Sequence, residues 1–344
     1  MGCRPSLVIA PLMILGVILA QCPDSVAAWG ADGHRLTCHI AEPLLTPAAA
    51  EAVKSLLPEY ANGSLASLCT WPDDIDGCGS GRGPVLCTTS TLLIFTATTI
   101  MRLDAKALSF LTVVMHLPTG DCHDELMEKN MCVAGAIYNY SSQLLGYKAP
   151  SNWTTDALVP LQQGENSYNL MEALLFLAHY VGDIHQPLHV GFTGDLGGNT
   201  IMVHWYTRKY NLHHIWDSEF IFRARDYIFG QDITALTNAI YLNVTVTNKL
   251  ASGHIILISF DRNLSLCGYL TFSPYDFFCV GLVRFASESI NLACKYAYRN
   301  ATPGTTLQDE YFLSRWPLVE RRLAQGAVRL ATLLNHLFSA NVSS

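Results

Sequence analysis

The sequence predicts one mostly α-helical domain that follows a short secretory leader. Apolar residues recur at spacings of three and four over most of the chain, as they do on the buried face of a helix. The alternation typical of strands is confined to one stretch near residues 197–208. The 344 residues contain no repeat and no clear linker, and this length suits one large domain. We therefore expect an all-α, multi-helix domain over residues 29–344 with a short β-hairpin near residues 197–208.

The first 28 residues have the three parts of a secretory signal peptide. Arg4 supplies a positive charge, an apolar run extends from Leu7 to Ala20, and three small residues end at Ala28. The apolar run is short for a membrane span, so an uncleaved anchor is the less favoured alternative. We expect cleavage before Trp29, passage through the secretory pathway to the cell exterior or vacuole, and no membrane attachment afterwards.

Glycosylation and cysteine content fit a secreted protein. Eleven cysteines are present, and nine remain after Cys3 and Cys22 leave with the leader. The odd number is unusual for an oxidised protein. N-x-S/T sequences predict N-glycosylation at Asn62, Asn139, Asn152, Asn243, Asn263, Asn300 and Asn341.

Helices are predicted in order along the chain. The first strong signal follows Thr46, a good N-cap with Pro47 at the first helical position. Pro317 is expected to interrupt the last amphipathic segment early. The apolar spacing predicts helices over residues 46–58, 132–146, 169–183, 215–228, 232–244 and 311–338.

The overall charge argues against binding nucleic acid through a basic surface. The formal net charge is −7, and only 14% of residues are charged. Lys and Arg clusters supply most of the attraction in basic nucleic-acid-binding proteins. If this protein acts on a phosphodiester, other cations must neutralise much of the phosphate charge.

Histidine and aspartate recur at a spacing that suits a metal site. His179 and Asp183 are four apart on a predicted helix, so they share a face, and His213 and Asp217 repeat the pattern. Pro187 can turn the chain so that His189 faces the same cavity. A single pair of this kind is more often a hydrogen-bonded pair, but two pairs with a third histidine favour a metal. His and carboxylate ligands suit Zn²⁺ with open coordination positions.

Further candidates lie near the predicted mature N-terminus and around the first pair. His34 and the Asp73-Asp74 pair add donors of the same types. His185 is a candidate for orienting a ligand imidazole, because such rings need hydrogen-bonding partners.

Four motifs together make a family resemblance specific: WGADGH, CTWPDDI, LAHYVGDIHQPLHVGFTGDLGGNTI and NLHHIWD. Their order and spacing resemble the zinc-dependent nuclease type I family of plants and fungi, whose plant members are called bifunctional nucleases. The resemblance covers roughly residues 29–76, 122–245 and 286–338.

The resemblance implies a fold like zinc phospholipase C and a cluster of three zinc ions. Carried over by residue, one ion would bind Trp29 through its free α-amine and carbonyl, with His34 and Asp183. A second would bind Asp73, His179 and the shared Asp183. The third would bind His189, His213 and Asp217.

The resemblance also implies the activity and further site residues. It implies an endonuclease that hydrolyses single-stranded DNA and RNA to 5′-phosphorylated products, with Asp73 and Asp183 as catalytic residues. Asn199 is a candidate for substrate binding, although a turn residue is an equal reading. Cys38 and Cys69 are expected to form a disulfide, and the protein is expected to be a monomer.

Two segments depart from the family pattern, residues 77–121 and 246–285. The family places another zinc-ligating histidine shortly after the WPD sequence, in a stretch like SPLHY, and residues 82–101 lack it. We interpret both segments as products of mis-splicing or a shifted reading frame. His116 and Cys87 are poor substitutes, because ligand geometry must be held tightly. We therefore expect the site of Asp73, His179 and Asp183 to be compromised in this exact chain.

Two alternatives follow from the same residues. The chain could be a zinc-binding glycoprotein with impaired catalysis, because one ligand histidine is missing. It could also be a phosphodiesterase of the phospholipase C type that acts on lipid head groups.

Overall fold

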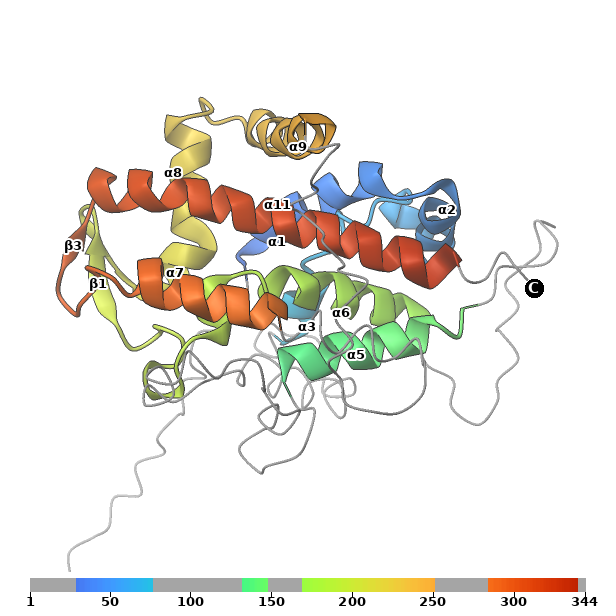
Figure 1. The fold of residues 1–344 in the computed structure, drawn as a ribbon, viewed down its shortest axis with the longest axis horizontal. Coiled ribbons are helices and arrows are strands. Elements are labelled where there is room, and N and C mark those ends of the chain that lie inside the picture. The colour runs from blue at the N-terminus through green and yellow to red at the C-terminus, as the bar shows by residue number, and fades with distance from the viewer. Residues whose placement is uncertain (1–28, 77–131, 148–168, 251–283, 340–344) are drawn as a thin grey trace, which may run out of the picture.

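A computed structural model describes residues 29–76, 132–147, 169–250 and 284–339 (Figure 1). Helices dominate this part of the chain, and the expected all-α class with a short β element is confirmed. The predicted signal peptide, the atypical segment 77–121 and most of the segment 246–285 lie outside the described residues.

The longest helix, α11 (Asp309–Ser339), runs across the molecule (Figure 1). Helices α1 (Ala31–Ala41) and α2 (Pro47–Leu56) pack against it. The expected interruption at Pro317 was wrong, because α11 continues through it. Pro317 lies on the exposed face, and Leu313, whose carbonyl loses its helical donor, is 61% exposed. Water can therefore satisfy that carbonyl.

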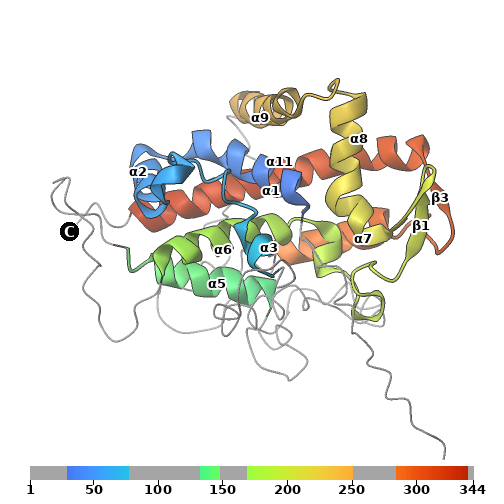
Figure 2. The same ribbon diagram turned by 180° about the vertical axis from the view of Figure 1, so that it is seen from behind.

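Helices α5 (Val133–Leu144) and α6 (Leu170–Asp183) lie side by side below α11 (Figure 1). The Asn169 side chain caps α6 by accepting from the Glu172 amide at 3.2 Å. From Ala173 onward every residue of α6 is buried. The short α3 (Trp71–Asp76) also packs on α6 and lies on the side seen in Figure 2. Thus α6 carries its polar residues through the centre of the molecule.

The β element is a three-stranded sheet at one end of the molecule (Figure 1). Strands β1 (Met202–Trp205) and β2 (Arg208–Asn211) form an antiparallel hairpin, a few residues later than expected. Strand β3 (Thr306–Leu307) pairs parallel with β1. Two residues are too few to show alternation, so the sequence did not predict β3.

Beyond the hairpin, α7 (Leu212–His214) leads into a π-helical turn (Ile215–Glu219), α8 (Phe220–Tyr227) and α9 (Ile233–Leu250). The sequence predicted one continuous helix from residue 215, whereas its first turn is widened. Single π-helical turns often occur at functional sites, and this one contains Asp217.

The turn after α6 is held in place by two elements distant in sequence. Ser289 donates a hydrogen bond to the carbonyl of Ile184 at 2.5 Å. Buried Arg322 of α11 donates through Nε to the carbonyl of His185 at 2.9 Å. These bonds fix the backbone that joins Asp183 to His189.

Candidate metal centre

Seven His and Asp side chains from separate elements gather in the centre of the molecule. Six are buried, and only Asp73 is half-buried. They come from α1, α3, α6, the 3-10 turn Pro187–Val190, α7 and the π-helical turn, as His34, Asp73, His179, Asp183, His189, His213 and Asp217. All seven were predicted from the sequence.

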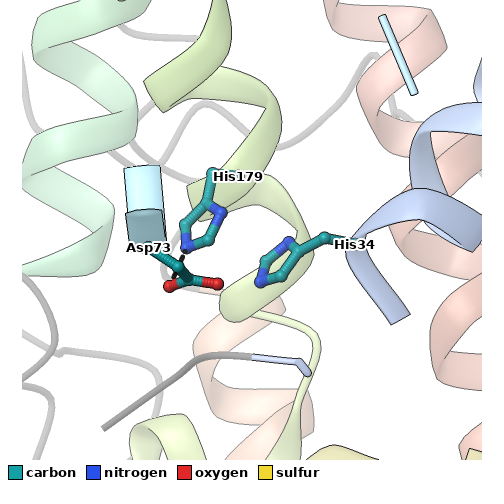
Figure 3. Close-up of side chains that lie close together, drawn as sticks. All are labelled: His34, Asp73 and His179. Carbon is teal, nitrogen blue, oxygen red and sulfur yellow. Dashed lines mark ion pairs between the residues drawn. The ribbon is translucent and has the colours of Figure 1, made fainter. Parts of the chain in front are cut away.

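The inner group consists of His34, Asp73, His179 and Asp183. The imidazoles of His34 and His179 stack with centroids 3.7 Å apart, beside the Asp73 carboxylate (Figure 3). Nε2 of His179 lies 3.3 Å from Oδ1 of Asp73. His34, Asp73 and His179 each offer one possible ligand atom, and these three atoms all lie within 4.8 Å of one another.

Asp183 faces both histidines of the inner group with different oxygens. Its Oδ1 lies 3.3 Å from Nε2 of His34, and its Oδ2 lies 3.6 Å from Nε2 of His179. Among the residues that the structure describes, both carboxylate oxygens of Asp183 and both ring nitrogens of His34 are buried without a hydrogen-bond partner. Leaving so many buried polar atoms unsatisfied would be costly, so the arrangement fits a carboxylate that bridges two cations.

The outer group consists of His189, His213 and Asp217. Oδ1 of Asp217 lies 3.4 Å from Nε2 of His189, and Oδ2 lies 3.2 Å from Nε2 of His213. The two Nε2 atoms are 3.1 Å apart. Three donor atoms therefore converge on one point from three elements.

The hydrogen bonds on the far side of two rings set their tautomers. Nδ1 of His179 lies 3.0 Å from the carbonyl of Cys69, and Nδ1 of His213 lies 2.7 Å from the carbonyl of Gly197. A carbonyl only accepts, so each Nδ1 must donate. In a neutral ring this leaves a lone pair on Nε2, which points at the carboxylates and suits a metal.

The spacing of the donor atoms fits zinc. Ligands bound at about 2.0–2.1 Å in a tetrahedron are separated by about 3.3–3.4 Å. The separations between histidine nitrogens and Asp73, Asp183 or Asp217 oxygens run from 3.2 to 3.6 Å. These residues could hold metal ions without a large rearrangement.

The pKa shifts show that the centre favours a cation beside its carboxylates. Burial raises the pKa of Asp183 to about 6 and that of Asp217 to about 7. Burial alone would lower the pKa of His179, but Asp183 and Asp73 raise it to about 9. Burial holds the pKa of His34 well below its usual value, and neighbouring His179 lowers it further. The carboxylates of Asp183 and Asp73 thus stabilise positive charge on the His179 ring.

Trp29, the first described residue, lies beside the inner group. Its buried indole Nε1 donates to the carbonyl of Gly182 at 2.9 Å, and the next residue, Gly30, donates its amide to the carbonyl of Asp217 at 3.0 Å. The mature N-terminus expected from the sequence would therefore begin at the metal centre.

Two glycines allow the histidines to approach the backbone. A Cβ on Gly182 would lie 3.1 Å from Nδ1 of His34, which is tighter than ordinary contact. Gly197 has a φ of +63°, and its Cβ would lie 2.4 Å from the carbonyl oxygen of Leu188. The backbone conformation at Gly197 and its closeness to Leu188 therefore require glycine at this position.

A disulfide ties two ligand-bearing segments together. Cys38 and Cys69 are bonded, as the resemblance implied. Cys38 lies one turn after His34 on α1, and Cys69 supplies the carbonyl that accepts from His179. The bond therefore connects the backbone around His34 directly to the partner of His179.

Gln186 contacts the centre although sequence reasoning did not select it. It is fully buried, and its Nε2 donates to Oδ1 of Asp217 at 2.5 Å. The only sequence signal is its place between Asp183 and His189. His185, considered for such a role, instead donates from Nδ1 to the carbonyl of Val181 and accepts at Nε2 from Arg329 at 2.8 Å. Its partners are thus on α6 and α11.

Asn199 lies in the loop after Gly197 and Gly198. Its side-chain amide donates to the carbonyl of Leu196 at 2.8 Å, as a turn residue does. Among the predicted glycosylation sites, Asn62, Asn139, Asn243 and Asn300 are exposed. Asn152, Asn263 and Asn341 lie outside the described residues, as do Cys87 and His116. Within the described ranges, the helices are too short or too polar to cross a bilayer.

Comparisons with known proteins show which family this chain resembles over most of its length. The family model described as S1/P1 Nuclease matches residues 29–339. The chain is 42% identical to Endonuclease 4 of Arabidopsis thaliana, and the match covers 94% of each chain. It is 40% identical to Endonuclease 2 of the same plant, over 95% of this chain and 96% of the relative. Nuclease P1 of Penicillium citrinum is 23% identical over 92% of this chain and its own full length.

Proposed function

The chain belongs to the S1/P1 nuclease family and is a hydrolytic nuclease, and we propose that it is a secreted, zinc-dependent endonuclease. In this proposal it hydrolyses single-stranded DNA and RNA to 5′-phosphorylated products. The observation that carries the proposal is the convergence of buried His and Asp donors with two tautomers fixed by backbone carbonyls. Family membership favours nucleic acid over a lipid head group as the substrate.

We assign the donors to three zinc ions. Asp183 would bridge two inner ions, one held with His34 and Trp29 and the other with Asp73 and His179. The two oxygens of Asp183, each facing a different histidine, support this division. The outer ion would take His189, His213 and Asp217. When bound, zinc lowers the pKa of a water molecule and stabilises charge on phosphoryl oxygens.

The protein's own residues would prepare this chemistry. Asp73 and Asp183 keep negative charge beside His179, while the backbone carbonyls of Cys69 and Gly197 hold two imidazoles in place. Water adds to phosphorus, the bond to the 3′ oxygen breaks, and that oxygen leaves as a hydroxyl. The phosphate would then remain on the 5′ oxygen of the following nucleotide, so the downstream fragment would carry a 5′ phosphate and the upstream fragment a 3′ hydroxyl. Single-stranded substrates suit such a site, because their bases and backbone are not held in a duplex.

Secretion and a mature N-terminus at Trp29 belong to the same proposal. The family model begins at Trp29, and Trp29 and Gly30 contact the carbonyls of Gly182 and Asp217 at the centre. Cleavage before Trp29 would free an α-amine there as a ligand. The exposed asparagines Asn62, Asn139, Asn243 and Asn300 could carry glycans, and Asn199 could contact substrate.

The test is the structure of the products made by the purified secreted protein. We expect it to cut single-stranded DNA and RNA faster than duplex DNA, and to leave ends that a 5′-phosphate-dependent ligase accepts. Phosphatidylcholine should be left intact. Products with 3′ phosphates, or preferential hydrolysis of the lipid, would refute the proposal.

N-terminal sequencing of the same sample tests the processing step. Trp29 should be the first residue. A variant that retains one residue before Trp29 should lose inner-site zinc, and full zinc content in it would show that the amine is not a ligand.

A further inference from the structure

Gln186 joins two parts of the outer group through one buried amide. Its Nε2 donates to Oδ1 of Asp217, and its Oε1 accepts from the backbone amide of Leu188, each at 2.5 Å. Leu188 directly precedes His189. One side chain therefore connects the carboxylate on the π-helical turn to the backbone that carries a histidine on the 3-10 turn.

The partners fix the orientation of this amide. With its ends exchanged, Oε1 would face the Asp217 carboxylate and Nε2 would face the Leu188 N–H, so both contacts would be repulsive. The side chain is fully buried, so water does not compete for either bond. The amide can hold its two partners in one relative position.

This position determines how Asp217 presents its oxygens. Asp217 Oδ1 accepts from Gln186 and lies 3.4 Å from Nε2 of His189, while Oδ2 lies 3.2 Å from Nε2 of His213. The donated bond restricts rotation of the carboxylate and leaves lone pairs directed at both histidines.

We infer that Gln186 is a positioning residue that sets the zinc affinity of the outer group. The inference rests on the proposed zinc centre and assigns a residue outside the ligand set. Gln186 also belongs to the turn itself, because the amide of His189 donates to the Gln186 carbonyl at 3.1 Å. Within the part of the chain that the structure describes, its side-chain hydrogen bonds go to Asp217 and Leu188 and not to Asp73 or His179, so its removal should act on the outer ion.

The test compares Gln186→Met with a matched variant elsewhere. Asn335 of α11 also makes two hydrogen bonds to the backbone through one amide: Oδ1 accepts from the Thr46 N–H at 2.7 Å and Nδ2 donates to the Leu44 carbonyl at 3.0 Å. Asn335→Leu therefore removes a pair of amide hydrogen bonds away from the His and Asp groups, although these bonds are less buried than those of Gln186. Outer-shell partners change metal affinity by about 10- to 100-fold when they are removed.

The readouts are zinc content by elemental analysis and zinc affinity in competition with a chromogenic chelator. We expect Gln186→Met to release one ion about 10- to 100-fold more readily than the wild type, while Asn335→Leu keeps all ions. Gln186→Asn retains a buried amide but is too short to reach both partners, so it should show the same release. It serves as the folded variant if Gln186→Met is insoluble.

The outcomes separate this inference from the proposed function. If wild-type protein binds no zinc, the proposed function itself fails. If the wild type binds zinc, and both Gln186 variants retain every ion with wild-type affinity, the role of Gln186 is refuted. Equal zinc loss in Asn335→Leu would also refute it, because the effect would then come from general destabilisation.

Discussion

Nδ1 of His213 donates a hydrogen bond to the carbonyl of Gly197, and the two atoms are 2.7 Å apart. This bond orients the imidazole so that Nε2 faces Asp217. Gly197 can offer its carbonyl only because it adopts a φ of +63° beside the carbonyl of Leu188, where a Cβ has no room. A backbone conformation therefore determines the orientation of a proposed ligand.

Replacement of Gly197 by alanine should damage the outer group. The new Cβ would lie 2.4 Å from the oxygen of Leu188, in a conformation that costs an L-residue on the order of 1–3 kcal/mol. We expect a lower free energy of unfolding and loss of one zinc ion. Denaturant unfolding and elemental analysis measure both. Gly194→Ala is the control, because its Cβ would meet no atom of the described residues within 4 Å. Equal effects in both variants would contradict the role assigned to Gly197.

Substitution of Asp183 should release more zinc ions than substitution of Asp217. Asp183 faces two histidines that we assign to different ions, whereas both partners of Asp217 belong to one. We expect Asp183→Asn to lose two ions and Asp217→Asn to lose one, with a fall in activity of about 100-fold or more for Asp183→Asn. Elemental analysis of each purified variant gives the count. Loss of the same number of zinc ions from both variants would refute the proposal that Asp183 bridges two ions.

Removal of the disulfide should weaken the inner group more than the outer one. Cys38 and Cys69 enclose a separation of 31 residues, and a bond over such a loop stabilises a protein by about 3–4 kcal/mol. In Cys38→Ser/Cys69→Ser, His34 and the carbonyl partner of His179 lose their covalent connection. We expect a lower unfolding temperature and reduced inner-site zinc, measured by calorimetry and chelator competition. Unchanged zinc affinity in a destabilised variant would show that the bond serves stability alone.

The atypical segment gives a prediction about this exact chain. Residues 82–101 lack the histidine that the family would place after the WPD sequence. With free choice of synonymous codons, reading the same segment two bases later can give WSSPLHYINTPDFHCNYDY, which contains the family's SPLHY sequence. Substitution of this sequence for residues 82–101 should raise zinc occupancy of the Asp73, His179 and Asp183 site and raise activity on single-stranded DNA. Both versions should be expressed and assayed side by side. Equal zinc content and equal activity would show that the segment is a functional variant.

The sequence predicted the candidate metal ligands better than it predicted the residues that orient them. His179 and Asp183 share a face because a helix repeats every 3.6 residues, and this rule needs no tertiary information. The meeting of His34 with His179, over a separation of 145 positions, was expected only through family resemblance. Gln186 carries no spacing signal, because its role depends on how two turns pack. At Pro317 the local sequence predicted a helix break that the structure does not have, because this residue lies on the exposed face of α11.

The most direct test of the account is single-stranded DNA hydrolysis by the purified chain before and after metal removal. We predict that the purified chain binds zinc, with three ions per chain once residues 82–101 are replaced by the family-like segment. Activity should disappear after dialysis against a chelator and recover with Zn²⁺ but not with Mg²⁺, since imidazole ligands favour zinc. The metal-free protein should also unfold at a lower temperature, because ligands that bind only the folded state stabilise it. Undiminished hydrolysis by protein shown to contain no metal would contradict the central claim.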